Sequence, residues 1–354
     1  MSTPRQTLTY LRHLFEHRGI APNRRYGQNF LIDLNTHDLI ARSAELASQD
    51  VILEVGPGAG ALTTLMAPQV SAVVSVEIDP ALAQLTREAV SGLPNVRVLN
   101  MDALSRKSEI NPEVLDNVRA GLAVAPDRRF KLVANLPYNV ATPIISNLLV
   151  HPDLCPSLMV VTIQRELAER MLAEPHTEMY GSLSVMVQAL ADAEMIRILS
   201  PKVFWPRPKV ESAIVKIVPS AEKRAAIPDL PWFHEVVRRI FTLRRKNLRV
   251  VLFSLWRDQW TSKAEVDALI ESIDLTGDVR AESMNVTEFI DLSEALRSRF
   301  GGRRPTELPD PHAAASPPYD YHPLDPDNDD DDGDNGDSDS GADGDSGGGD
   351  GGDG

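Results

Sequence analysis

The chain is poor in cysteine and in long apolar runs, and both absences exclude classes of protein. Cys155 is the only cysteine in 354 residues, so an internal disulfide is impossible, and zinc ribbons and CxxC redox motifs are excluded. No apolar stretch approaches the roughly 18 to 20 residues of a membrane-spanning helix, and residues 1–19 lack the apolar centre of a secretory signal. We therefore expect a reduced, soluble, cytoplasmic protein with no membrane partner.

Basic charge is scarce in one part of the chain only. Lys and Arg number 36 against 51 Asp and Glu. From Pro305 onward there are sixteen acidic residues and no Lys or Arg, which leaves 36 basic against 35 acidic residues in 1–304. Gly, Asp, Pro and Ser dominate 305–354, so this segment cannot bury enough apolar surface to offset the entropy of ordering. We predict a disordered tail, for which solubility is the default role.

Short apolar runs alternate with segments of helical length from Asp50 onward. The runs are VILEVG, SAVVSVEID, NVRVLNMD, FKLVANLPY and SLMVVTIQ. This alternation predicts a parallel sheet with crossover helices, an α/β fold. Apolar residues at helical spacing between positions 8 and 15 predict a short helix before the sheet. Residues 105–129 are longer than a typical connection, so we expect a surface insertion with a short helix of its own.

The second part of the chain changes from strands to helices. FWPRPKVESAIVKIVP, from residue 204, predicts a proline-punctuated loop that runs into one more strand. Residues 232–300 are typical of helices, and FHEVVRRIFTLRRKNLRVVLFSLW is the clearest of them. We therefore divide the chain into an α/β domain at 1–220, a small helical domain at 221–304 and the tail at 305–354.

A strand, a glycine turn and a helical pattern follow one another around Gly56 and Gly58. This order is typical of a nucleotide-binding βαβ unit, although any turn that needs positive φ would also use glycine. Glu77 ends the next strand, where a carboxylate can accept hydrogen bonds from both ribose hydroxyls. Asp102 ends the strand after that, where it can accept one from an adenine amino group. Either acid alone could be a solvated strand end, but together they predict a site for an adenosine derivative.

The fourth strand ends in the tetrapeptide Asn135-Leu136-Pro137-Tyr138. Pro137 fixes its own φ and forces Leu136 into an extended conformation, so the Leu136 carbonyl and the Asn135 amide can point out of the sheet edge. Two acceptors on the hydrogens of an aromatic amine favour its pyramidalisation and free its lone pair for attack. Tyr138 offers a surface on which a base can stack, worth about 1–3 kcal/mol. The pattern predicts an adenine or cytosine amine as the substrate.

The sequence over residues 20–290 resembles one family. NLPY resembles the signature of adenine amino-methyltransferases that use S-adenosylmethionine. The wider matches are GQNFLID at 27–33, EVGPGAGALT at 54–63, VEID at 76–79, MDA at 101–103, NLPYNVATPI at 135–144, and then QRELAERMLAEP, YGSLSV, FWPRPKVESA and FTLRRKNLR. Together they are similar to the small-subunit ribosomal RNA adenine N(6),N(6)-dimethyltransferases, the kasugamycin-resistance dimethyltransferases. Two departures are Tyr26, where leucine or phenylalanine is usual, and Val250-Val251, where Asn-Ser is usual.

The resemblance implies a fold, a reaction and a set of site residues. The fold is a Rossmann-like S-adenosylmethionine-dependent methyltransferase domain followed by a small helical domain. The reaction is dimethylation of the 6-amino group of two adjacent adenines in the 3′-terminal hairpin loop of 16S rRNA, during small-subunit biogenesis, with no general base and no metal. The implied cofactor-binding residues are Asn29, Leu31, Gly56, Gly58, Glu77, Asp102 and Asn135. The implied catalytic residues are Asn135, Leu136, Pro137, Tyr138 and Phe204, with Phe204 stacking on the target base opposite Tyr138.

Basic residues form three clusters that suit RNA phosphates. They lie at Arg24 and Arg25, near FWPRPK, and in the predicted long helix, where Arg238, Arg245 and Arg249 would share a face. The expected RNA-binding residues are Arg207, Lys209, Arg238, Arg244, Arg245, Lys246 and Arg249. A charged helix face can also be merely solvated. The expected partner is the small ribosomal subunit with its rRNA, bound by a monomer.

Two other functions stay open at this point. One is the related large-subunit rRNA adenine methyltransferase that confers macrolide resistance, which differs in the subunit that carries the product. The other is a non-catalytic assembly or transcription factor that keeps the fold and the cofactor pocket. The presence of Glu77, Asp102 and NLPY argues against lost chemistry. A nicotinamide dehydrogenase would share the glycine turn and the first acid, but NLPY disfavours it.

Overall fold

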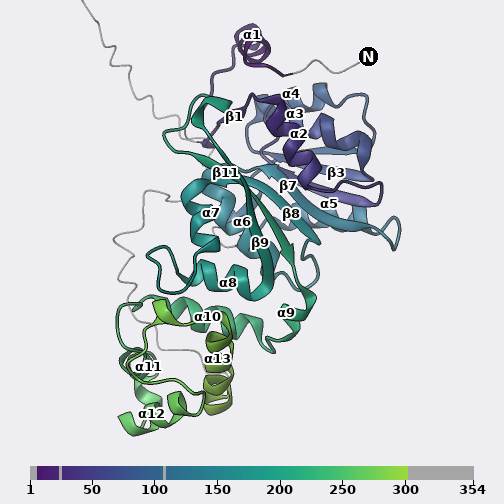
Figure 1. The fold of residues 1–354 in the computed structure, drawn as a ribbon. Coiled ribbons are helices and arrows are strands. Elements are labelled where there is room, and N and C mark those ends of the chain that lie inside the picture. Colours follow the sequence, from purple (N-terminus) through teal and green to yellow (C-terminus); the bar gives the residue numbers. More distant parts are fainter. Residues whose placement is uncertain (1–5, 24–25, 107–108, 302–354) are drawn as a thin grey trace, which may run out of the picture. The chain divides into compact units, whose positions relative to one another are not determined.

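The computed structural model describes residues 6–23, 26–106 and 109–301 (Figure 1). The predicted disordered tail at 305–354, together with Arg24 and Arg25, lies outside the described residues. In the part of the chain that is described, no helix is long and apolar enough to cross a membrane.

A seven-stranded sheet, in the order β4-β3-β2-β7-β8-β11-β9, holds the fold together. The strands are β2 (Asp50–Val55), β3 (Ala72–Glu77), β4 (Val96–Asn100), β7 (Arg129–Asn135), β8 (Leu158–Gln164), β9 (Ala191–Leu199) and β11 (Ser212–Pro219). The first five are parallel, whereas β11 is antiparallel to both β8 and β9. The predicted α/β fold and the five predicted parallel strands are confirmed; β9 was not predicted.

Helices cover both faces of the sheet (Figure 1). They are α2 (Leu34–Ser43), α3 (Ala61–Met66), α4 (Pro80–Ala89), α5 (Pro112–Leu122), α6 (Tyr138–Val150), α7 (Arg165–Leu172) and α8 (Ser182–Leu190). Successive strand residues point to opposite faces. Ile52 thus packs with Ile40 of α2 and Leu62 of α3, while its neighbour Leu53 belongs to the cluster that includes α5, α6 and α8. This explains why the predicted strands are apolar throughout.

The segment 105–129 is not the surface insertion that its length suggested. After the short strands β5 (Leu104–Arg106) and β6 (Glu109–Ile110), α5 buries Val114, Leu115 and Val118 and contacts β2, β3 and β7. Parallel strands need a crossover of a dozen or more residues, and α5 is the crossover from β4 to β7. The prediction of a helix is confirmed, but its surface position is wrong because the helix has a buried apolar face.

The C-terminal part is helical, as expected. It comprises α9 (Ala221–Ala225), α10 (Leu230–Phe241), α11 (Leu248–Leu255), α12 (Lys263–Glu271) and α13 (Val286–Phe300). Trp232 and Trp256 are buried side by side, with their ring centroids 6.2 Å apart. The Trp232 indole N–H donates to the Ser293 carbonyl. The helices α10 to α13 share one buried apolar cluster with residues of α8 and of the sheet. The boundary at 220/221 stays a prediction.

The predicted long helix is in fact two helices, α10 and α11, separated by a turn. The hydroxyl of Thr242 donates to the Arg239 carbonyl at 2.6 Å, a bond of the kind that competes with helix propagation. A β-bridge between Asn247 and Arg280 then holds the chain apart from the helical path. The prediction that Arg238, Arg245 and Arg249 share one helix face is therefore wrong.

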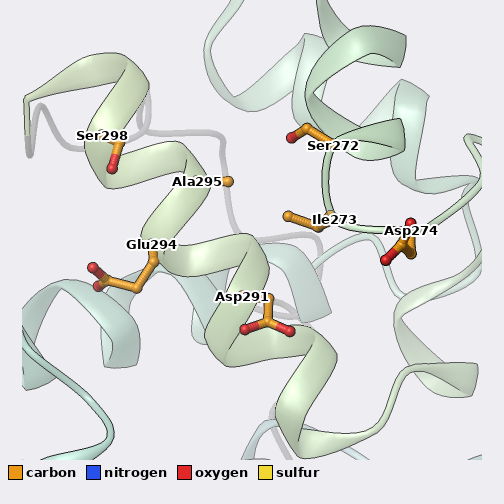
Figure 2. Close-up of a pocket in the computed structure, with 7 residues that line it drawn as sticks. All are labelled: Ser272, Ile273, Asp274, Asp291, Glu294, Ala295 and Ser298. Carbon is orange, nitrogen blue, oxygen red and sulfur yellow. The ribbon is translucent and has the colours of Figure 1, made fainter.

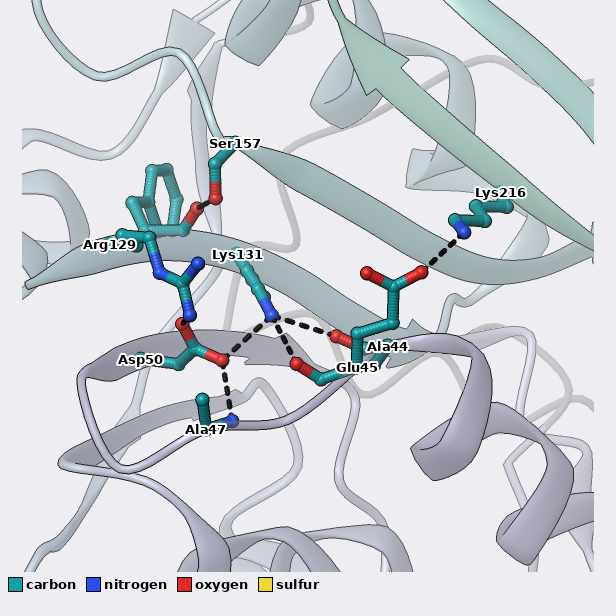
Figure 3. A network of polar contacts seen from close by, with 9 residues as sticks. Ala44, Glu45, Ala47, Asp50, Arg129, Lys131, Ser157 and Lys216 are labelled. Carbon is teal, nitrogen blue, oxygen red and sulfur yellow. Dashed lines mark hydrogen bonds and ion pairs between the residues drawn. The ribbon is translucent and has the colours of Figure 1, made fainter.

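A buried ion pair ties the amino edge of the sheet (Figure 3). Asp50, at the start of β2, is 0% exposed, and its Oδ2 lies 2.7 Å from Nζ of Lys131 on β7. Lys131 also donates to the carbonyls of Ala44 and Glu45 at 2.9 and 2.7 Å. The guanidinium of Arg129 lies 3.2 Å from Oδ1 of Asp50. Ion pairs thus connect β2 with β7, and the hydrogen bonds of Lys131 connect β7 with the loop after α2.

Candidate functional site at the carboxyl edge of the sheet

The glycine turn lies where β2 ends and has no room for side chains. Gly56, Gly58 and Gly60 have φ angles of 74°, 61° and 82°, a region that only glycine adopts readily. A Cβ added to Gly56 would lie 3.0 Å from the ring of Pro137, and one added to Gly58 would lie 3.0 Å from the ring of Phe30. The turn is therefore packed between the NLPY and GQNFLID segments, which are far apart in the sequence.

Glu77 lies at the carboxyl end of β3, beside this turn. Its side chain is 4% exposed; Oε2 accepts the Gly58 N–H and Oε1 the Asp79 N–H, both at 3.1 Å. Burial raises the pKa of Glu77 to about 7. Each oxygen accepts one of these bonds and has a further lone pair. The carboxylate can therefore accept two hydroxyl hydrogens, which suits a ribose diol.

Asp102 lies at the same edge, after β4. The N–H of Met101 donates to the Glu77 carbonyl at 3.1 Å, which holds the two strand ends together. The Asp102 carboxylate is partly exposed and accepts the Leu104 N–H at 2.9 Å. The two acids predicted from successive strand ends thus lie on neighbouring strands.

Asn135 links the fourth strand end to the GQNFLID segment. Its Nδ2 donates to the Asn29 carbonyl at 3.2 Å, while the Leu136 N–H donates to the Thr162 carbonyl at 3.1 Å. Asn29 itself donates to the Gly27 carbonyl. Leu31 buries its side chain in the cluster under α2.

The two predicted stacking residues have different surroundings. Tyr138 begins α6, and its hydroxyl lies 2.6 Å from that of Ser212 on β11, which fixes the ring. The stacking of Phe204 on the target base stays a prediction, and the residue is 1% exposed and packs in the core. The reason for this burial is the two-stranded ladder of β1 (Phe30–Leu31) and β10 (Phe204–Trp205), in which Phe204 pairs with Leu31 and faces the core with it.

The predicted RNA-binding residues fall into two groups. Arg238 is paired with Glu235 at 3.0 Å and Arg249 with Asp267, and Arg244 donates to the Glu178 carbonyl. The second group is exposed, and within the described ranges none of its members enters an ion pair. It consists of Arg207 and Lys209 after β10 and of Arg245 and Lys246 in the turn between α10 and α11.

The comparisons with known proteins agree with this geometry. A family model described as ribosomal RNA adenine dimethylase matches residues 20–297. The chain belongs to this family. Ribosomal RNA small subunit methyltransferase A of Ligilactobacillus salivarius is 36% identical over 81% of this chain and 94% of its own length. The protein of the same name from Lactiplantibacillus plantarum is 38% identical over 78% and 91%.

Two solved structures share the architecture of this rRNA adenine dimethylase. The 23S rRNA methyltransferase ErmE is 29% identical, with a TM-score of 0.54, over 76% of this chain and 99% of its own. A dimethyladenosine transferase from Plasmodium falciparum has a TM-score of 0.63 at 23% identity, over 75% and 97%, and is similar in fold.

The cofactor of this rRNA adenine dimethylase is S-adenosyl-L-methionine, and the residues present fit it. The turn at Gly56 and Gly58 leaves its backbone uncovered by side chains of its own, as close approach of a ligand requires. Glu77 offers acceptors for a diol and Asp102 an acceptor for an amine. These acceptors therefore match the ribose hydroxyls and the adenine amino group of an adenosine.

Sequence reasoning missed Glu54, which lies within β2 just before the glycine turn. Its Oε2 accepts the hydroxyls of Thr63 at 2.6 Å and Ser75 at 2.8 Å, and burial raises its pKa to about 7. An acid inside the apolar run VILEVG was the available signal, because a buried carboxyl needs hydrogen-bond partners. Missed too were the contacts of the N-terminal helix with the turn.

A surface pocket lies between the end of α12 and α13, and none of its lining residues belongs to the site at the sheet edge (Figure 2). Its lining residues are Ser272, Ile273, Asp274, Asp291, Glu294, Ala295 and Ser298. It has no aromatic side chain to stack on a base and no basic one to bind phosphate. The described residues contain no cluster of His, Cys, Asp and Glu suited to a metal ion.

Proposed function

We propose that this rRNA adenine dimethylase transfers methyl groups from S-adenosylmethionine to the 6-amino groups of two adjacent adenines in the 3′-terminal hairpin loop of 16S rRNA. The single observation that carries the proposal is the position of the Pro137 ring beside Gly56, where an added Cβ would lie 3.0 Å from it. It packs the segment that can hold an aromatic amine directly against the turn that holds the cofactor. The small-subunit enzymes to which the chain is similar support the choice of substrate.

The cofactor supplies an electrophilic sulfonium methyl group, and the chain holds it at the sheet edge. Glu77 accepts the ribose hydroxyls and Asp102 the adenine amine. The turn at Gly56 and Gly58 lets the backbone approach the ligand. Asn29 and the Leu31 backbone close over the methionine end.

Catalysis by this chain is positioning of the target amine. Because Nδ2 of Asn135 donates to the Asn29 carbonyl, the oxygen of the same amide is left to accept an N–H of the adenine. The Leu136 carbonyl accepts the other N–H, and Pro137 keeps the two acceptors at a fixed separation. Charge develops on the amine as the methyl is transferred, so these acceptors stabilise the transition state more than the ground state. The amine becomes acidic only then, and its proton passes to water.

Tyr138 supports the base after it has left its stack in the RNA, as enzymes that act on bases require. Its hydroxyl contact with Ser212 holds the ring at the mouth of the site. Arg207, Lys209, Arg245 and Lys246 are the exposed cations that we assign to phosphate contacts. Arg238, Arg244 and Arg249 can bind phosphate only if they release the partners that they bond in this structure. The partner is the small subunit, bound by a monomer in the cytoplasm.

The test combines purified protein, isotopically labelled S-adenosylmethionine and undermethylated small ribosomal subunits, with labelled nucleosides mapped by mass spectrometry. We expect dimethyladenosine at two adjacent positions near the 3′ end. Asn135→Ala should slow formation of the product about 10²- to 10³-fold, whereas Asn117→Ala, whose side chain donates to the Glu113 carbonyl within α5, should leave the rate unchanged. A parallel reaction contains large ribosomal subunits in place of small ones. Label on the large subunits alone would favour the activity named for ErmE, which the structural likeness makes the second candidate. Binding of cofactor and subunit without transfer would favour an assembly factor.

A further inference from the structure

The N-terminal helix α1 (Leu8–Arg18) lies against the cofactor edge of the sheet domain. Its Leu11 and Phe15 are buried in an apolar cluster with Phe30 of β1, Ala59 of the glycine turn, and Leu82 and Leu85 of α4. At its end, the guanidinium of Arg18 bonds both carboxylate oxygens of Glu88 on α4, at 3.0 and 2.6 Å. The helix therefore contacts three elements that border the site.

Gln6, just before α1, reaches the glycine turn directly. Its side chain is 6% exposed, and Nε2 donates to the Ala59 carbonyl at 2.6 Å. Ala59 lies between Gly58 and Gly60, the two residues whose positive φ angles shape the turn. Glycines are conformationally free in the absence of such contacts, so this bond restricts the orientation of the peptide groups in the turn.

Phe15 reaches the same turn through a second aromatic ring. The rings of Phe15 and Phe30 meet edge to face at 5.1 Å, and Phe30 lies so close to Gly58 that a Cβ there would be 3.0 Å from it. Trp205 completes the cluster, 5.4 Å from Phe15. Packing is therefore continuous from α1 through Phe30 to the glycine turn.

We propose that α1 is part of the cofactor site and that Gln6 and Phe15 are positioning residues for S-adenosylmethionine. Gln6 holds the turn by its hydrogen bond to the Ala59 carbonyl. Phe15 holds it by packing on Phe30, which lies beside Gly58. A turn already ordered in its binding conformation loses less entropy when the ligand arrives, and this raises affinity without a new contact to the ligand. The inference rests on the cofactor of the proposed function and not on the identity of the methyl acceptor.

The experiment measures binding of S-adenosylhomocysteine to the full chain by calorimetry, without RNA and well below the unfolding temperature of every variant. Gln6→Ala should raise Kd about threefold to tenfold, the size of one lost hydrogen bond. Gln6→Glu keeps the length of the side chain but has no hydrogen to donate when ionised, so it should bind as weakly as Gln6→Ala. The matched control is His13→Ala, on the exposed face of α1, which should bind like wild type.

Phe15 supplies the second arm. Phe15→Ala should weaken S-adenosylhomocysteine binding, and Phe15→Leu, which keeps an apolar contact with Phe30, should restore most of it. In kinetics, the expected change is a higher KM for S-adenosylmethionine with kcat and subunit affinity close to wild type. If the variants lower the unfolding temperature yet bind S-adenosylhomocysteine like wild type, α1 only stabilises the fold and the inference is wrong. Because no RNA is present, a failed methylation assay would overturn the proposed function without touching this result.

Discussion

Each of the two edges of the sheet buries a carboxylate, but the two carboxylates have different partners. Asp50, on the amino edge, is 0% exposed and lies beside Lys131 and Arg129. Glu77, on the carboxyl edge, is 4% exposed, and within the described residues only backbone N–H groups are seen to bond its side chain. Burial without a cation raises the pKa of Glu77 to about 7. At the amino edge, basic side chains of the chain itself neutralise the buried carboxylate. At the carboxyl edge, the carboxylate can still accept hydrogen bonds from a ligand.

This difference separates stability from function. A buried charge whose partner comes from the chain itself contributes to folding, and breaking the pair leaves an isolated charge. A buried acid with no charged partner destabilises the fold in its ionised form, and such perturbed groups gather at functional sites. Variants at the two edges should therefore affect different measurements.

The largest effect is expected at the amino edge, from Lys131→Met. It leaves Asp50 buried without its main partner, which should cost about 3–5 kcal/mol of unfolding free energy. Urea unfolding followed by circular dichroism checks this value. Lys216→Met, which breaks only the exposed pair with Glu45, is the control and should cost at most about 1 kcal/mol. Equal losses of unfolding free energy in the two variants would contradict the larger contribution that we assign to the buried pair.

At the carboxyl edge, Asn135→Ala should affect catalysis instead of folding. Loss of one preorganised polar group in a transition state is worth about 10² to 10³ in rate, so single-turnover methylation should slow by that factor. The unfolding free energy should change by no more than about 1 kcal/mol, since one partly exposed hydrogen bond is lost. A rate close to wild type would contradict the assigned role.

Glu77→Gln sharpens the comparison through pH. Hydrogen bonds from ribose hydroxyls favour the ionised carboxylate, so S-adenosylhomocysteine should bind wild type more tightly as pH rises from 6 to 8. Glu77→Gln should bind about tenfold to a hundredfold more weakly at pH 8, the range expected for bonds to a charged group, and should lose the pH dependence. Calorimetry at three pH values measures both. A variant that keeps the wild-type slope would assign the titration to another group.

The smallest effect is expected from Glu54→Gln. Burial raises the folded-state pKa of Glu54 to about 7, above that of the unfolded chain, so the stability contributed by its protonated form is present at low pH and is lost as pH rises through 7. Relative to wild type, Glu54→Gln should therefore gain on the order of 1 kcal/mol between pH 6 and pH 8. Thermal unfolding in a Glu77→Gln background checks it, because Glu77 titrates in the same range. A constant difference across that range would contradict the prediction.

Much of the fold was predictable because its signals are local. The strand that ends at Val55, the glycine turn after it and the acid at Glu77 follow from residue order alone. The crossover role of α5 was missed because only its contacts with β2, β3 and β7 show its buried face. The break between α10 and α11 was missed because the bridge between Asn247 and Arg280 is not visible in the periodicity of either segment.

By itself, the sequence determined the strands of the parallel sheet and the positive-φ turn, because each depends on neighbouring residues and on backbone sterics. Only the tertiary structure decided which buried acid is paired, that Phe204 faces the core, and that Gln6 bonds Ala59. Each of those outcomes depends on a partner distant in the chain, such as Lys131 for Asp50 or Leu31 for Phe204. The free energy of burying or pairing a group belongs to the assembled environment, which no local pattern contains.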